Sequence, residues 1–331
     1  MSVNICILTM GGTISGTSQE NSTTNYHIGN LCIQSLLDKI PLHTKPQIHI
    51  AKIQAIANID SIDVSYENLI QLAQEAQQNL DSSNIDGVVI THGSDTLEES
   101  AFFLNLVIKS SKPIVLVAAM RPSDSVSADG LQNLYNALCL CADTSSRDRG
   151  VMVVMNDKIF GARDMTKTQT LNLDAFAAPN SGIFGSIIDG VPYFRAASTM
   201  PHTTQTPLMI WHLQPQPCVE IVYATNAPYF EAVLQALIES GIRGIVIAGG
   251  GAGNIPKAQR QILKDKILAY KLIVVRSSRV CSGLVLPDSI DEECATIASY
   301  DFNPQKSRIL LSLVLGYTNN KQEIAKIFAS F

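Results

Sequence analysis

The chain has 331 residues, of which 46% are hydrophobic and 16% are charged, and its formal net charge is −5. This hydrophobic content supports a full core, and the length suits one large domain or two unequal ones. The low share of charged residues argues against a disordered chain or a coiled coil. An acidic balance without a basic stripe argues against nucleic acid as a partner.

Strands and helices alternate through the first half of the chain. Short β-branched runs predict strands at residues 4–9, 47–53, 87–91, 113–118 and 151–155. Apolar residues at i, i+3 and i+4 spacing predict helices at 66–80, 98–110 and 131–142. Such alternation predicts crossover connections and a mainly parallel sheet flanked by helices.

A change of composition divides the chain. Residues 192–217 are rich in Thr, Pro, Gln and His and predict a connecting segment. Beyond it, strands are predicted at 219–224, 244–248 and 272–275, and helices at 229–240, 257–269 and 306–327. We therefore expect an α/β fold with a large N-terminal domain at 1–191, a connection at 192–217 and a smaller C-terminal α/β domain at 218–331.

Three observations bear on the cellular location. No apolar run approaches the roughly 20 residues that cross a bilayer, so no membrane partner is expected. The first nine residues lack a cationic start and a small-residue cleavage site, which predicts a first strand rather than a signal peptide. Seven scattered cysteines without a second close pair indicate thiols in a reducing cytoplasm.

A glycine-rich turn follows the first predicted strand. It reads Thr9-Met-Gly-Gly-Thr-Ile-Ser-Gly16, and the polar residues after it, up to Asn25, predict a loop that closes as a lid. In parallel sheets ligands bind outside the carboxyl ends of strands, so Thr13 stands where a reactive hydroxyl is useful. A Gly-Gly-Thr sequence is, however, more often only a turn.

Other strand ends also carry polar groups. Thr91-His-Gly-Ser-Asp-Thr96 ends one strand, and Thr96 is a candidate for a helix capping box. Residues 119–134 leave another strand and enter a helix. Residues 156–168 contain Lys167. Most lysines lie on the surface in contact with solvent, whereas a buried lysine beside a polar group would serve as a general base.

Taken together, these blocks resemble the signature sequences of bacterial L-asparaginases. The resemblance spans essentially the whole chain in order and includes Val275-Arg-Ser-Ser-Arg279 and Asn303-Pro-Gln-Lys-Ser-Arg308. It implies a threonine-nucleophile amidohydrolase that converts L-asparagine to L-aspartate and ammonia through an acyl-enzyme intermediate. No cofactor is expected, because no metal is needed and the six histidines lack ligand spacing.

The resemblance also assigns roles to individual residues. Those implied to act in hydrolysis or to face the scissile amide are the nucleophile Thr13, the lid tyrosine Tyr26, the second hydroxyl Ser94, the substrate-binding Asp95, the base Lys167 and Ala119, through its backbone carbonyl. The chemistry is coherent, because a hydroxyl becomes a nucleophile when a base or relay takes its proton, and turn amides stabilise an oxyanion.

Some positions depart from the family pattern. Ser94 stands where threonine is usual. Ala57 and Asn58 align with the serine and the glutamine or glutamate that hold the substrate's α-carboxylate and α-amino group. From these two we expect asparagine to remain the best simple substrate but to bind weakly, with glutamine poorer. The alternatives are a glutaminase-asparaginase, an amidase for a modified amide, or a protein that binds amides without turnover.

The resemblance further implies a homotetramer built from intimate dimers. Asn254 matches a residue that crosses between subunits. The glutamate contributed by the neighbouring subunit aligns near Ile290, and a small gap would bring Asp288 or Asp291 there instead.

Two other classes are less consistent with the sequence. Residues 249–254 do not complete a dinucleotide-binding glycine motif, and no serine-hydrolase elbow is present. A transfer-RNA-linked amidotransferase subunit is disfavoured by the acidic charge and the missing N-terminal domain.

Overall fold

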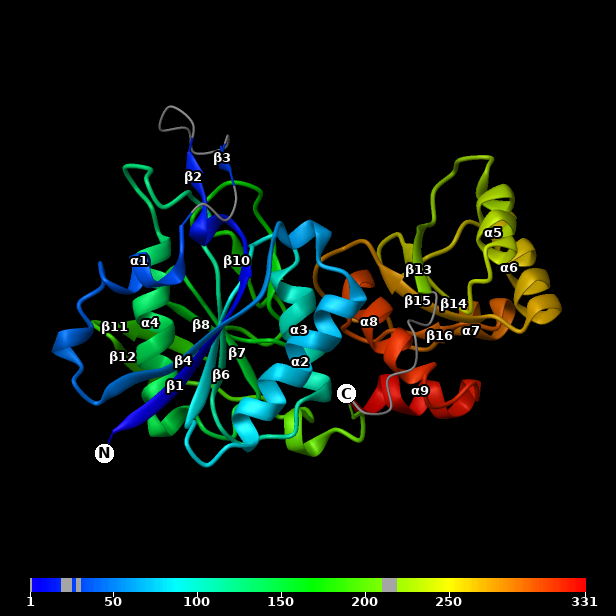
Figure 1. The fold of residues 1–331 in the computed structure, drawn as a ribbon. Helices are drawn as coiled ribbons and strands as arrows, with labels where there is room; N and C mark the ends of the chain where they lie inside the picture. The colour runs from blue at the N-terminus through cyan, green and yellow to red at the C-terminus, as the bar shows by residue number, and fades with distance from the viewer. Residues whose placement is uncertain (1, 19–25, 28–30, 210–218) are drawn as a thin grey trace. The chain divides into compact units, whose positions relative to one another are not determined.

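The computed structural model describes residues 2–18, 26–27, 31–209 and 219–331, without the side chains of residues 26 and 27. The chain forms two compact units, Met1–Ile210 and Trp211–Phe331. Each unit has its own sheet (Figure 1). The boundary between them falls inside the segment 192–217 that composition singles out.

The sheet of the first unit has eight strands. Five neighbouring strands are parallel: β4 (Ile48–Ile59), β1 (Val3–Gly11), β5 (Gly87–Thr91), β6 (Ile114–Val117) and β7 (Val151–Met155). Three antiparallel strands extend it: β8 (Lys158–Gly161), β11 (Gly185–Ile188) and β12 (Val191–Phe194). The chain runs from β1 to β4 on one side and then crosses to β5 on the other. The order therefore reverses at β1 and β5, and open α/β sheets bind ligands at such a switch point.

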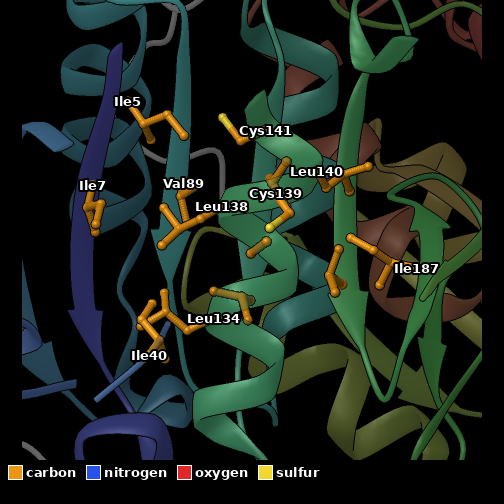
Figure 2. Packing of buried hydrophobic residues seen from close by; sticks show 14 of the residues in the cluster. Ile5, Ile7, Ile40, Val89, Leu134, Leu138, Cys139, Leu140, Cys141 and Ile187 are labelled. Carbon is orange, nitrogen blue, oxygen red and sulfur yellow. The ribbon is translucent and has the colours of Figure 1, made fainter. Parts of the chain in front are cut away.

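Helices cover both faces of this sheet, which explains why its strands are apolar throughout. Alternate residues such as Ile5 and Ile7 face α4 (Gly130–Ala142), whose Leu134 and Leu138 pack near Val89 (Figure 2). The opposite face is covered by α2 (Tyr66–Asp81) and α3 (Leu97–Val107). Each fully buried Leu, Ile or Val contributes roughly 1.5–3 kcal/mol relative to exposure, so the sheet is a firm platform for its loops.

The second unit contains four parallel strands. They lie in the order β13 (Val219–Tyr223), β14 (Gly244–Gly249), β15 (Ile273–Ser278) and β16 (Ile297–Ala298). One apolar cluster joins this sheet to α5 (Phe230–Glu239), α6 (Lys257–Tyr270) and α7 (Ser289–Cys294). The helix α8 (Pro304–Val314) packs on β13, β14 and β15, and α9 (Lys321–Ser330) follows it. The predicted fold class, a mainly parallel α/β sheet with a smaller C-terminal α/β unit, is confirmed.

Two regions differ from the sequence-based expectation. The predicted single helix at 306–327 is two helices, because the chain leaves helical structure after Val314 and Asn320 caps a new helix with its side chain. The sequence predicts no strand between residues 158 and 194. In the structure this segment forms the three antiparallel strands β8, β11 and β12 and the pair β9 (Thr166–Lys167) and β10 (Phe176–Ala177).

Candidate active site

Thr13 lies in a turn that two glycines make possible. Gly11 and Gly12 have φ angles of 98° and 84°, which side chains rarely adopt, and a short 3-10 helix, η1 (Thr13–Ser15), follows at once. A Cβ on Gly12 would lie 2.4 Å from the backbone nitrogen of Gly93. The turn after β1 therefore touches the turn after β5, and the buried Thr13, 4% exposed, stands beside that contact.

Ser94, Asp95 and Lys167 form one cluster. The Lys167 Nζ donates to the Ser94 hydroxyl oxygen at 2.9 Å and to an Asp95 carboxylate oxygen at 2.6 Å. Ser94 is buried, the Lys167 side chain is 15% exposed, and Asp95 is 55% exposed. The amine of Lys167 is therefore held against a buried hydroxyl instead of lying in bulk solvent. The pairing of β9 with β10 fixes this position, because Lys167 pairs with Phe176.

Ser61 joins the cluster, although sequence reasoning missed it. It begins the 3-10 helix η3 (Ser61–Asp63) after β4 and is 2% exposed. The backbone N–H of Asp95 donates to its hydroxyl oxygen at 3.2 Å, and the Thr96 hydroxyl donates to its carbonyl oxygen at 2.6 Å. Over the part of the chain that the structure describes, the Ser61 hydroxyl accepts a hydrogen bond and donates none, so its hydrogen can donate to a ligand.

The predicted capping box at Thr96 is wrong. Thr96 occupies the N-cap position of α3, but its side chain makes no capping hydrogen bond to the helix. Its hydroxyl binds the Ser61 carbonyl instead, which ties the start of α3 to the end of β4. A hydrogen bond to a residue distant in the sequence has thus replaced the capping bond within the helix.

Ala57 and Asn58 lie on β4, close to the turn before Thr13. A Cβ on Gly11 would lie 3.1 Å from the carbonyl carbon of Asn58. Both residues line a cavity of about 400 Å³, together with Ser15 and Cys32. The structure thus brings Ser61, three residues beyond Asn58, to the Ser94–Asp95 turn. The sequence alone does not show which residue after Asn58 reaches this turn, because no pattern fixes where the strand ends.

Ala119 follows β6 and is fully buried. The carboxylate of Asp129 accepts the backbone N–H groups of Met120 and Arg121, each at 3.0 Å, and so fixes the chain immediately after Ala119. Gly130 brings the start of α4 to within 3.1 Å of the Ile14 side chain and 3.3 Å of Ala119, measured from a Cβ placed on it. Ala119 and the Thr13 turn therefore meet at the start of α4.

The predicted lid begins as a short hairpin. The strands β2 (Thr17–Ser18) and β3 (Tyr26–His27) pair in antiparallel fashion, with Ser18 opposite Tyr26. The backbone N–H of Ser18 donates to the Asp124 carboxylate at 2.8 Å, and this bond lowers the pKa of Asp124. The side chain of Tyr26 and residues 19–25 lie outside the described part of the chain.

The subunit-crossing candidates all belong to the second unit. Asn254 is exposed in a turn that pairs with Gly250. Ile290 is buried in the apolar cluster, and Asp288 caps α7. Asp291 binds the buried Arg276 with both carboxylate oxygens, at 2.9 and 2.5 Å. Burial alone would raise the pKa of Asp291, but the hydrogen bonds from Arg276 and Thr296 outweigh it and hold that pKa below its usual value. Asp291 therefore stabilises its own unit.

Over the described residues, the structure shows neither a cluster of metal-ligand side chains nor a membrane-spanning helix. Within those ranges no three His, Cys, Asp or Glu side chains gather closely enough to hold a metal ion. No helix in the same part of the chain has the length and apolar character to cross a membrane. Six cysteines are free thiols, and Cys218 lies outside the described residues.

The fold is α/β, and this cluster places hydroxyls, a lysine amine and a carboxylate together at the switch point of its larger sheet. Two family models match the chain: Asparaginase, N-terminal, over residues 4–199, and Glutaminase/Asparaginase C-terminal domain, over residues 219–328. The chain belongs to the asparaginase family of amidohydrolases.

Curated relatives match the chain over nearly its full length. L-asparaginase 2 of Escherichia coli is 40% identical and L-asparaginase 2 of Bacillus subtilis is 39% identical, covering 99% of this chain and 93% and 86% of those proteins. A glutaminase-asparaginase of Acinetobacter glutaminasificans is 38% identical over 99% of both chains. A probable cytoplasmic L-asparaginase from Campylobacter jejuni has a TM-score of 0.95 and 43% identity, covering 100% of both chains.

Proposed function

We propose that this protein hydrolyses the side-chain amide of L-asparagine to L-aspartate and ammonia, with Thr13 as the nucleophile. The observation that carries the proposal is the meeting of two strand ends at the switch point. The turn of Thr13 packs on Gly93, and the next residues, Ser94 and Asp95, bind Lys167. A hydroxyl, a second hydroxyl and an amine at one sheet edge supply a nucleophile and a proton relay.

The reaction has two stages. The Thr13 oxygen attacks the amide carbon, and its proton passes through the Ser94–Lys167 pair to the leaving nitrogen. Ammonia then departs and leaves an aspartyl ester on Thr13. Water then attacks the ester, and the same pair returns a proton to Thr13 as aspartate leaves. Backbone amides of the turn stabilise the oxyanion in both stages. The Ala119 carbonyl accepts a hydrogen from the substrate amide, and Tyr26 assists Thr13 from the lid.

Substrate recognition is assigned to Asp95 and Ser61. Asp95 keeps more than half of its surface open, so its carboxylate can pair with an α-ammonium group. Ser61 offers a hydroxyl hydrogen next to it, which can donate to an α-carboxylate. Ser61 is thus a further candidate partner of the substrate head group, in addition to the Ala57–Asn58 pair, which lines a cavity with Ser15. The weak binding of asparagine expected from Ala57 and Asn58 stays a prediction.

Ammonia release across a panel of amides tests this function. The panel contains asparagine, glutamine and an N-acetylated asparagine, each given to wild type and to Thr13→Ala. We expect asparagine to be hydrolysed best by the wild type and the variant to lose orders of magnitude in kcat with its melting temperature retained. Wild-type turnover of Thr13→Ala would remove Thr13 from the mechanism, and a preference for glutamine or the acetylated amide would reassign the substrate.

We also propose a cytoplasmic homotetramer, with Asn254 and the segment 288–291 near a neighbouring active site. The name of the Campylobacter jejuni relative supports the location, although a 41% identical relative from Haemophilus influenzae is named a probable periplasmic L-asparaginase. Light scattering of the purified protein and fractionation of its native cells test the two statements. A monomer in solution or export from the cytoplasm would contradict them.

A further inference from the structure

His92 is a fully buried histidine beside the site that the proposed mechanism does not use. Its Nδ1 lies 2.8 Å from the Gly93 carbonyl oxygen, and its Nε2 lies 2.9 Å from the Ser100 hydroxyl oxygen in α3. A carbonyl oxygen only accepts, so Nδ1–H is the donor to Gly93, and Nε2 accepts from Ser100. Burial lowers the pKa of His92, which agrees with a neutral ring.

The carbonyl that His92 holds belongs to a peptide that other backbone and side-chain atoms crowd on two sides. Gly93 meets the Thr13 turn at Gly12, where a Cβ would lie 2.5 Å from the Gly93 Cα. On another side, a Cβ on Gly93 would lie 2.7 Å from the Ser61 hydroxyl oxygen. The same peptide bond continues into Ser94. A rotation of this peptide would therefore move Ser94 relative to both Thr13 and Lys167.

Both the main chain and the imidazole of His92 are held in place. The His92 backbone N–H donates to the Val117 carbonyl oxygen at 2.9 Å, which fixes the main chain to β6. Ser100 is buried in the first turns of α3. The imidazole thus connects the catalytic turn to a helix that packs in the core, and its two nitrogens have different tasks.

We propose that His92 is a positioning residue. Its Nδ1–H fixes the Gly93–Ser94 peptide, and through it the Ser94 hydroxyl at Lys167, while Ser100 holds the ring in that orientation. This inference rests on the proposed function. It assigns no proton transfer to His92, because the ring contacts a backbone carbonyl and a serine and reaches Ser94 only through the peptide.

Two substitutions separate the tasks of the two nitrogens. The amide nitrogen of His92→Asn can occupy the place of Nδ1 and still donate to Gly93, whereas that of His92→Gln reaches toward the place of Nε2. We expect His92→Asn to keep kcat within about threefold of wild type, which corresponds to about 0.65 kcal/mol. We expect His92→Gln to lose roughly 10- to 100-fold, the scale of an ångström-sized misplacement.

His202 provides the matched control in the same unit. It is also buried, its Nδ1 lies 3.1 Å from the Thr203 hydroxyl oxygen, and burial lowers its pKa as well. His202→Gln should reduce the melting temperature without lowering kcat. Equal kcat losses in His92→Gln and His202→Gln would show a general packing effect and overturn the proposal.

A double-mutant cycle tests whether His92 acts through Ser94. In a Ser94→Ala background the His92→Gln change should cost little further, because the group being positioned is gone. Full additivity would overturn the proposal. If His92→Gln does not fold, Ser100→Ala takes its place, with an expected loss in kcat of roughly 2- to 10-fold, and a kcat equal to wild type decides against the proposal.

The wild type serves as the reference throughout this experiment. If it releases no ammonia from asparagine, the proposed function fails and the inference fails with it. If it does, the ratios between variants and wild type decide the role of His92 alone.

Discussion

At the scale of single residues, Ser61 is the clearest addition that the structure makes. Ser61→Ala removes a hydroxyl from beside Asp95, and we expect KM for asparagine to rise roughly 10- to 100-fold, the cost of a charge-assisted hydrogen bond, with a smaller change in kcat. Steady-state kinetics measures this effect.

Ser65 supplies the control, since it lies four residues further on and caps α2. Ser65→Ala should lower the free energy of unfolding by about 1 kcal/mol and leave KM unchanged. A KM for Ser61→Ala that matches wild type would place the substrate carboxylate elsewhere.

A matched pair of substitutions distinguishes the role of Lys167 from that of Lys109, another partly buried lysine. Lys167→Met should abolish turnover with the fold retained, because it removes the partner of Ser94. Lys109 has its amine bound by the carbonyl oxygens of Thr203 and Thr206, at 2.8 and 2.7 Å, and burial lowers its pKa to about 8. Lys109→Met should therefore cost stability and spare kcat. Substantial turnover by folded Lys167→Met would exclude the relay.

At the scale of elements, the turn after β1 is tightly constrained. Gly12→Ala combines a positive φ with a backbone clash, and we expect a loss of about 2–4 kcal/mol in the free energy of unfolding and at least about 100-fold in kcat. Gly182 has a φ of 77°, and a Cβ placed on it would meet no atom within 4 Å, so Gly182→Ala isolates the backbone strain. It should cost about 1–2 kcal/mol and leave kcat unchanged. Similar kcat values in both variants would contradict the packing argument.

Periodicity predicts the central elements well. The strands at 87–91 and 151–155 and the helices near 66–80 and 131–142 are found almost residue for residue, because each has a long apolar pattern and a polar boundary. The edge strands β8, β11 and β12 are short and partly exposed, so they carry no comparable pattern. They form by adding in turn to the edge of the sheet, because β8 pairs with β7, β11 with β8 and β12 with β11.

Motifs single out the residues of the proposed catalytic cluster better than they single out its surroundings. Thr13, Ser94, Asp95 and Lys167 stand in distinctive blocks, and the turns and contacts described above bring these blocks together. Ser61 has no such block, and its role depends on where β4 ends. Thr96 is a similar case. Its sequence fits a capping box, but its hydroxyl donates to the Ser61 carbonyl oxygen, a partner that the sequence does not indicate.

At the scale of the whole molecule, two buried histidines predict acid sensitivity. Burial lowers the pKa of His92 and His202 below the usual 6.5, so below pH 6.5 the unfolded chain binds protons that the folded chain does not. Their contribution to stability is complete above pH 6.5 and is lost as the pH falls below it, by up to about 1.4 kcal/mol per pH unit for each histidine.

Denaturant titrations between pH 7.5 and 5 measure this slope. His92→Asn should reduce it, because one of the two groups no longer titrates. The carboxylate of Asp291, whose pKa is lowered, loses its contribution only at more acidic pH, below the usual 3.8. A free energy of unfolding that stays constant from pH 7.5 to 5 would contradict the assignment of neutral buried rings.

The proposed mechanism requires an ester at Thr13. Wild-type protein mixed with excess asparagine and quenched in acid within one turnover can be digested and mapped by mass spectrometry. The mechanism predicts an added aspartyl group on the peptide containing Thr13, and none on that peptide in Thr13→Ala. An aspartyl group on Ser94 or on any other residue, in protein that releases ammonia at the wild-type rate, would contradict it.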